Sequence, residues 1–183
     1  KHQGQIFWYG LLLVTVFVLP FCIDSFYIGE LSLVFIYAIA GIGLMLLVGF
    51  TGLVSLGHAA FLAIGAYTHA YLMTHGWPLL PSMISATLFT SLIGGMVGIP
   101  ALRMTGIYLA VATLAFAIII EQVLTHWISV TGGFRGMPVP LPKLFGIDIH
   151  DALSFYFFCL AILVICMLLA LNLLRSPTGR AMR

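Results

Sequence analysis

Two histidines and a serine lie inside one apolar stretch of the chain, residues 53–73. Ser55 precedes His58 by three residues and His69 follows it by eleven, so a helix would carry all three on much the same face. A serine beside a histidine is part of hydrolytic triads, but the sequence places no carboxylate to orient the imidazole. Two histidines at this spacing on one helix cannot clasp one haem iron, and we expect no metal site. A neutral histidine bonded to a neighbouring helix and a polar group that lines or gates a pathway both stay open.

Glu121 is the only acidic residue well inside another apolar stretch, residues 107–130. Thr125 and His126 follow it about one helical turn later. An isolated carboxylate in hydrocarbon is strongly unfavourable, so we expect Glu121 to face a partner or a water-filled cavity, or to be protonated. A proton relay, a contact with a substrate amine and a structural hydrogen bond are all compatible with this position.

These polar residues must be positioned by helices that cross a membrane. Hydrophobic residues make up 62% of the 183 residues and charged residues only 7%, whereas a soluble domain carries about 25% charged residues. Six apolar runs can each span about 30 Å of hydrocarbon, and unbroken runs exclude a β-barrel. We predict one all-α, polytopic transmembrane domain over residues 1–183. The predicted helices are 6–23, 31–50, 53–73, 80–102, 107–130 and 152–174, and a break in the third near Gly57 stays an open question.

Basic residues predict the orientation of these helices, because cytoplasmic loops carry an excess of lysine and arginine. With both the N-terminus and the C-terminus in the cytoplasm, five basic residues fall inside and two outside. The inner residues are Lys1, Arg103, Arg175, Arg180 and Arg183, and the outer residues are Arg135 and Lys143. The segment 132–151, rich in glycine and proline in its first half, is then an outer, turn-rich loop.

Small residues mark helix faces that can pack closely. Helices in lipid associate through close backbone approach and hydrogen bonds, because the bilayer gives them no hydrophobic drive to associate. Gly94 and Gly98 form a Gly-x-x-x-Gly pair in the predicted helix 80–102. We therefore expect these two glycines at a helix–helix contact.

Three stretches of the chain, in order, resemble one known family. They are "GLVSLGHAAFLAIGAYT" from Gly52, "LRMTGIYLAVATLAFAIII" from Leu102 and "TGGFRGM" from Thr131. Together they are similar to the permease subunits of bacterial branched-chain amino-acid ABC importers, over about residues 31–183. The Ser-Leu-Gly-His form resembles the M-type subunit rather than the H-type. Many members carry an acidic residue near the position of Ile118, whereas here the acid is Glu121, about one turn later.

The resemblance also implies roles for particular residues. The residues implied to lie at the translocation path or its gate are Ser55, Gly57, His58, Tyr67, Thr113 and Glu121. An outer turn would be formed by Thr131, Gly132, Gly133 and Gly136. Residues 175–183, with Gly179 and Arg180, resemble the start of the cytoplasmic loop that couples a permease to its ATPase. We therefore expect this sequence to be part of a longer permease.

As a member of this family, the chain would be a multi-pass transport subunit of the bacterial inner (plasma) membrane and not an enzyme. The resemblance implies a second, H-type permease, two cytoplasmic ATPase subunits and a periplasmic substrate-binding protein as partners. No phosphate-binding Gly-x-x-x-x-Gly-Lys-Ser/Thr motif occurs in the chain. The partner ATPases would therefore use the ATP and magnesium, and this chain would bind no cofactor. No basic cluster indicates a nucleic-acid partner.

Other functions stay open beside the import of branched-chain amino acids. The related importers of urea and short-chain amides share the fold and much of the same pattern, so the substrate is not fixed by the sequence. An ion-coupled secondary transporter would use Glu121 and a histidine as a proton relay, and its uptake would collapse with an uncoupler. An intramembrane enzyme that uses Ser55 or a histidine would need a convergent acid or a metal-ligand set, and the sequence shows neither.

Overall fold

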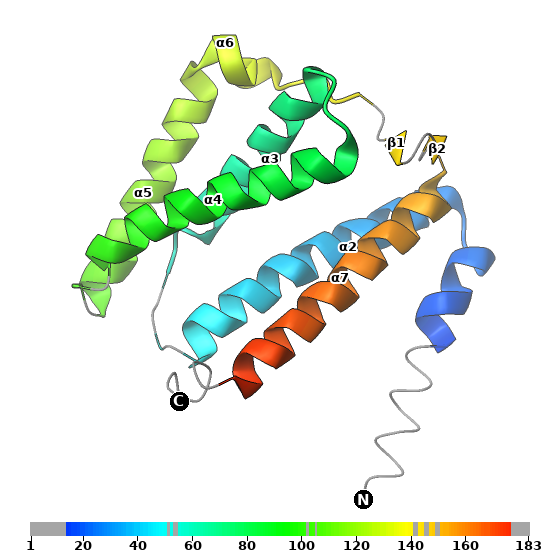
Figure 1. The fold of residues 1–183 in the computed structure, drawn as a ribbon, viewed down its shortest axis with the longest axis horizontal. Coiled ribbons are helices and arrows are strands. Elements are labelled where there is room, and N and C mark those ends of the chain that lie inside the picture. The colour runs from blue at the N-terminus through cyan, green and yellow to red at the C-terminus, as the bar shows by residue number, and fades with distance from the viewer. Residues whose placement is uncertain are drawn as a thin grey trace, which may run out of the picture.

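The protein is built almost entirely of helices in the computed structural model (Figure 1). The structure describes residues 14–50, 52, 55–101, 103–104, 106–140, 143–144, 147–148 and 151–176. A helical segment at residues 14–22 comes first. It is followed by α2 (Ser25–Leu44), the π-helical turn η1 (Met45–Phe50), α3 (His58–Thr74), α4 (Leu79–Ala101), α5 (Ile107–His126), α6 (Ile128–Thr131), the 3-10 turn η2 (Gly133–Arg135) and α7 (Ala152–Arg175). A short antiparallel hairpin pairs β1 (Lys143–Leu144) with β2 (Ile147–Asp148) before α7.

Four helices in the described part of the chain are long and apolar enough to cross a membrane. They are Ser25–Gly49, Leu79–Ala101, Ile107–His126 and Ala152–Arg175. The predicted all-helical membrane class is therefore confirmed. The first predicted helix, 6–23, is described only from residue 14, and α3 is 17 residues long. The count of six crossings and the cytoplasmic position of both termini stay predictions.

Glycine, proline and one tryptophan set several helix ends. The chain leaves α3 through Gly76, whose φ is 82°, a left-handed conformation that glycine adopts without steric cost. Pro100 lies in the last turn of α4, and a proline cannot support further helical hydrogen bonding through its own nitrogen. Trp127 has φ −82° and ψ 64°, so the predicted helix 107–130 is divided into α5 and α6.

Two other helices begin at positions that differ from the predicted ones. α2 starts at Ser25 rather than at residue 31, because the apolar run that we used to place it begins only after Glu30. A charged residue near the end of a membrane helix can reach water, so Glu30 does not end the helix. α3 starts at His58 rather than at residue 53, and residues 55–57 directly before it are not helical. The helix of the third apolar run therefore begins next to Gly57.

The helices form two packed sets (Figure 1). In the first set, α2 lies along α7, and Tyr156 of α7 is only 1% exposed, with its ring centroid 5.0 Å from that of Phe35. In the second set, α3 packs against α4 and α5, with Phe61 and Phe116 in ring contact at 5.3 Å. Large apolar side chains cover the outside, for example Leu88 and Met96 of α4. This arrangement suits a protein whose solvent is lipid.

Candidate functional site

The candidate site is centred on the helix break, which we define as Gly52 and Ser55–Gly57, the described residues between η1 and α3. None of these residues is helical, and they lie where the second predicted apolar run meets the third. Gly52 has φ 67°, a conformation that favours glycine. Non-helical backbone at membrane depth is tolerated only where protein buries it or where it lines a water-filled cavity. If the helix break lies at membrane depth, it must therefore be covered by protein or border a polar pathway.

Gly57, the residue before α3, lies directly against the backbone of α5. It is buried, and a Cβ added at this position would lie 2.7 Å from the carbonyl oxygen of Thr113 and 3.2 Å from its Cβ. The φ of Gly57 is −90°, so the requirement for glycine comes from the close approach and not from its own dihedral angles. The predicted site residues Gly57 and Thr113 are thus brought together.

Thr113 binds the helix break through a hydrogen bond as well. The Leu56 N–H donates to Thr113 Oγ1 at 3.0 Å, and Thr113 Oγ1 donates to the carbonyl of Ala110 at 3.0 Å. Thr113 is 9% exposed, so its hydroxyl is largely shielded from solvent and is bonded to protein groups. One side chain thereby connects the non-helical backbone to α5.

His58, the first residue of α3, reaches in the other direction to α2. Its Nε2 lies 3.0 Å from the carbonyl oxygen of Ala40, and a carbonyl can only accept, so Nε2 carries the hydrogen. A Cβ added at Gly43 would lie 3.3 Å from His58 Cε1, so a glycine there leaves space for the imidazole. His58 thus has a hydrogen-bond partner on a neighbouring helix. Ser55 is half-buried and lies three residues before it.

Tyr67 and Glu121 are not in contact with this cluster in any interaction that the structure shows. Tyr67 is half-buried on α3, nine residues beyond His58. Glu121 is exposed on α5, eight residues beyond Thr113, and eight residues correspond to about 12 Å along a helix. The structure therefore groups Gly57, His58 and Thr113, with Ser55 adjacent, and places the other two candidates further along their helices.

His69 forms a separate polar contact between α3 and α4. Its Nδ1 lies 2.9 Å from Ser82 Oγ, and that hydroxyl donates to the carbonyl of Leu79 at 2.8 Å. Because the hydroxyl has one hydrogen, both bonds form together only when His69 Nδ1 donates. Ser82 is completely buried. This pair connects α3 to α4. His69 lies eleven residues after His58 in the sequence.

The predicted outer turn is held by glycine conformations and by one buried threonine. Thr131 is 2% exposed; its one hydroxyl hydrogen is within reach of the carbonyls of both Leu124 and Trp127, and its oxygen accepts the N–H of Gly133. Gly132, Gly133 and Gly136 all have positive φ. A Cβ added at Gly132 would lie 2.4 Å from the carbonyl oxygen of Gly136. The four residues named from the sequence therefore build one tight turn, which leaves the Phe134 side chain 88% exposed.

The remaining predicted residues are placed as follows. A Cβ at Gly94 would lie 3.7 Å from Phe61 of α3, whereas one at Gly98 would have nothing within 4 Å. Gly179 and Arg180 lie outside the described residues. Within the described residues there is no group of three metal-ligating side chains.

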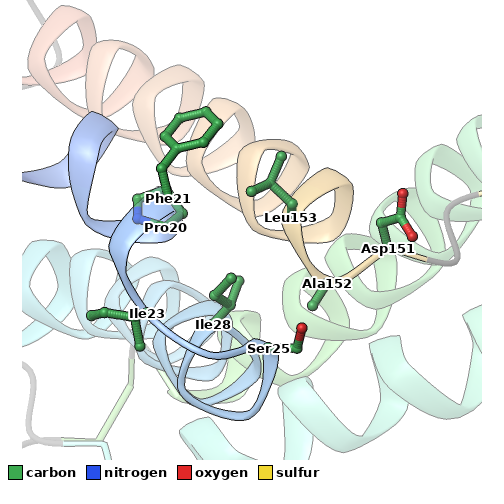
Figure 2. Close-up of a pocket in the computed structure, with 8 residues that line it drawn as sticks. All are labelled: Pro20, Phe21, Ile23, Ser25, Ile28, Asp151, Ala152 and Leu153. Carbon is green, nitrogen blue, oxygen red and sulfur yellow. The ribbon is translucent and has the colours of Figure 1, made fainter.

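A hollow of about 560 Å³ lies elsewhere, where the segment 14–22 meets the N-terminal ends of α2 and α7 (Figure 2). It is lined by the apolar side chains of Pro20, Phe21, Ile28 and Leu153 and by the polar side chains of Ser25 and Asp151. None of the residues predicted from the sequence lines it. It does not belong to the cluster at the helix break.

Some residues of the cluster were not identified from the sequence. Ala40 and Leu56 contribute only backbone atoms, so their side-chain types carry no signal. Gly43 gives a weak signal, because it follows Gly41 in an apolar run and small residues mark close approach.

Long apolar helices joined by buried polar contacts define a multi-pass membrane protein. Residues 26–183 match the family described as branched-chain amino acid transport system / permease component, and the chain belongs to that family. It is accordingly a transport subunit and not an enzyme, and a multi-pass protein of the bacterial inner membrane.

Two curated relatives are similar over nearly the whole chain. The high-affinity branched-chain amino acid transport system permease protein LivM of Escherichia coli (strain K12) is 35% identical, over 93% of this chain and 46% of the relative. The protein of the same name from Salmonella typhimurium (strain LT2) is 34% identical, over 98% of this chain and 48% of the relative. The chain thus spans about half the length of these relatives. No solved structure gives a significant match.

Proposed function

We propose that this chain is the M-type permease subunit of an ATP-binding cassette importer and forms part of the translocation path for branched-chain amino acids. The observation that carries the proposal is the helix break, held between α5 and α2 by Thr113 and His58. Broken membrane helices supply solute-binding backbone in other transporters. Membership in a family of branched-chain amino acid permeases supports the substrate class.

The proposed path lies beside Ser55, Gly57 and His58. These positions offer small and neutral polar groups and no fixed charge. A neutral path suits a zwitterion with an aliphatic side chain, because the two charges of the solute balance and its side chain needs no polar partner. Tyr67, Thr113 and Glu121 are proposed as further candidates for the path or its gate.

The proposed assembly contains an H-type permease, two cytoplasmic ATPase subunits and a periplasmic substrate-binding protein. ATP and magnesium are used by the ATPases, and this chain, as one transmembrane domain, binds no cofactor. Gly179 and Arg180 begin the loop that couples the permease to an ATPase. Both termini of the chain lie in the cytoplasm in this proposal, which the excess of inner basic residues supports.

Uptake by the intact permease, reconstituted with these partners in proteoliposomes, tests the proposal. We expect ATP-dependent uptake of labelled leucine that is lost when one ATPase is omitted. Uptake of labelled urea without leucine would keep the transport class and contradict the substrate. Uptake that needs a proton gradient, collapses with an uncoupler and requires no ATPase would contradict the importer and favour a proton relay at Glu121.

A further inference from the structure

Thr113 is the point at which the helix break meets α5. Its hydroxyl accepts the Leu56 N–H and donates to the carbonyl of Ala110, both at 3.0 Å. The adjacent Gly57 packs so closely on the Thr113 backbone that a Cβ would lie 2.7 Å from its carbonyl oxygen. A hydrogen bond and a steric contact therefore fix two successive residues of the break on the same residue of α5.

The Leu56 N–H depends on this hydroxyl because the break offers it no helical partner. A backbone N–H that is shielded from water without an acceptor costs a free energy comparable to a lost hydrogen bond. A threonine hydroxyl has one hydrogen and two lone pairs. Ala110 receives the hydrogen and Leu56 uses a lone pair, and Thr113 is 9% exposed. The hydroxyl is thus occupied within the protein and nearly hidden from a passing solute.

The far end of the break is held by a different helix. His58 Nε2 donates to the carbonyl of Ala40 in α2, at 3.0 Å. The backbone of Ser55–Gly57 therefore runs between two anchors, Thr113 on α5 and Ala40 on α2. Loss of the α5 anchor would free the stretch that precedes His58.

We propose that Thr113 is a positioning residue for transport: by holding the Leu56 amide it sets the course of the Ser55–Gly57 backbone along the path, without touching the solute. This inference rests on the proposed function and assigns to Thr113 a role that acts through the backbone of another segment. The role depends on the hydroxyl, because the hydroxyl accepts the Leu56 N–H. Serine therefore keeps the role, whereas valine, which has the shape of threonine but no hydroxyl, loses it.

The test compares Thr113→Val and Thr113→Ser in the intact permease, assembled with its partner permease, ATPases and binding protein. The matched control is Thr87→Val, since the Thr87 hydroxyl is exposed and donates to Met83 in its own helix. We expect Thr113→Val to lower leucine uptake per assembled complex about tenfold, because an unpaired Leu56 N–H destabilises the working conformation. We also expect more ATP to be hydrolysed per leucine, whereas Thr113→Ser and Thr87→Val match the wild type in both measurements.

A wild-type rate and a wild-type ATP-to-leucine ratio in Thr113→Val would overturn the inference. Equal impairment of Thr113→Ser and Thr113→Val would also overturn it, because the loss would then come from the methyl group. If Thr113→Val does not assemble, Thr113→Ala serves as the hydroxyl-free variant with the same expectations.

A second measurement separates this inference from the proposed function. Ser55→Cys, in a chain whose native cysteines are replaced by alanine, is labelled with a maleimide in membranes without any solute. Faster labelling in the Thr113→Val background than in the Thr113→Ser background supports the positioning role even if the wild-type complex transports no leucine. Equal labelling rates in the two backgrounds contradict it.

Discussion

At the scale of single residues, a side chain can supply a hydrogen bond that a proline prevents the backbone from making. The carbonyl of Val16 lies in the helical segment 14–22, where its helical partner would be the N–H of residue 20. Residue 20 is a proline and has no N–H. The Tyr156 hydroxyl donates to the Val16 carbonyl at 2.9 Å instead. Tyr156 therefore satisfies an acceptor that Pro20 leaves open.

Tyr156→Phe tests this substitution of partners. We expect it to destabilise the folded permease in detergent by about 1 kcal/mol, because the Val16 carbonyl loses its donor while the ring packing on Phe35 is kept. In a Pro20→Ala background, residue 20 regains its N–H, and Tyr156→Phe should cost much less. The measurement is a double-mutant cycle of unfolding free energies. An equal cost in both backgrounds would show that the hydroxyl does not compensate for Pro20.

Residue types alone identified part of the cluster at the helix break. His58 is unusual within an apolar run and was a site candidate for that reason, whereas Gly57 and Thr113 became candidates through the family resemblance. The structure brings Gly57 into contact with Thr113 and His58 into contact with α2, although their predicted role in the path stays a prediction. The roles of the Ala40 carbonyl and the Leu56 amide could not be predicted from the sequence. Almost every residue has such backbone groups, and only the fold decides which of them form these hydrogen bonds.

At the scale of the elements, the important feature is the passage from the second apolar run to the third, where a π-helical turn is followed by the helix break and then by α3. Hydropathy predicted the membrane helices because lipid selects for long apolar runs. It could not predict the break, because Gly52 and Gly57 are nearly neutral in such a pattern and are common in continuous membrane helices. The break coincides with the close approach of Gly57 to α5, a contact between residues 56 positions apart in the sequence, which no local pattern reveals.

Gly57→Ala tests whether this close approach is needed. The new Cβ would lie 2.7 Å from a backbone oxygen, which cannot rotate away as a side chain can. We expect the variant to lose about 1–3 kcal/mol of stability, a typical cost of overpacking, and to yield less assembled permease. Gly95→Ala is the control, because a Cβ there meets nothing within 4 Å. Thermal melting of the two purified variants is the measurement, and a Gly57→Ala melting temperature equal to that of Gly95→Ala would refute the requirement.

At the scale of the whole molecule, α5 connects two segments whose sides of the membrane can be tested. Arg103 is exposed before α5, and Phe134 is 88% exposed after it, in the turn that follows α6. If α5 crosses the bilayer in the predicted orientation, Arg103 lies in the cytoplasm and Phe134 outside. Charge counting predicts this arrangement, but the helices themselves would pack in the same way in the opposite orientation.

Cysteine labelling distinguishes the two orientations. In a chain without its native cysteines, we expect Phe134→Cys to react with an impermeant maleimide added to intact spheroplasts. Arg103→Cys should react only after the membrane is permeabilised. The reverse pattern would invert the topology. Reaction of both residues from the same side would show that α5 does not cross the membrane.

During synthesis, the segment 14–22 cannot form its hydrogen bond with Tyr156 until α7 has been made. Val16 leaves the ribosome 140 residues ahead of Tyr156, a delay of about ten seconds at translation rates of about 5–20 residues per second. Throughout this interval the Val16 carbonyl has neither a Pro20 N–H nor the Tyr156 hydroxyl, and hydrocarbon offers no replacement. The segment reaches its final stability only after α7 has entered the membrane. An early end to translation, before Tyr156 is made, would therefore leave the Val16 carbonyl without the donor that the folded protein gives it.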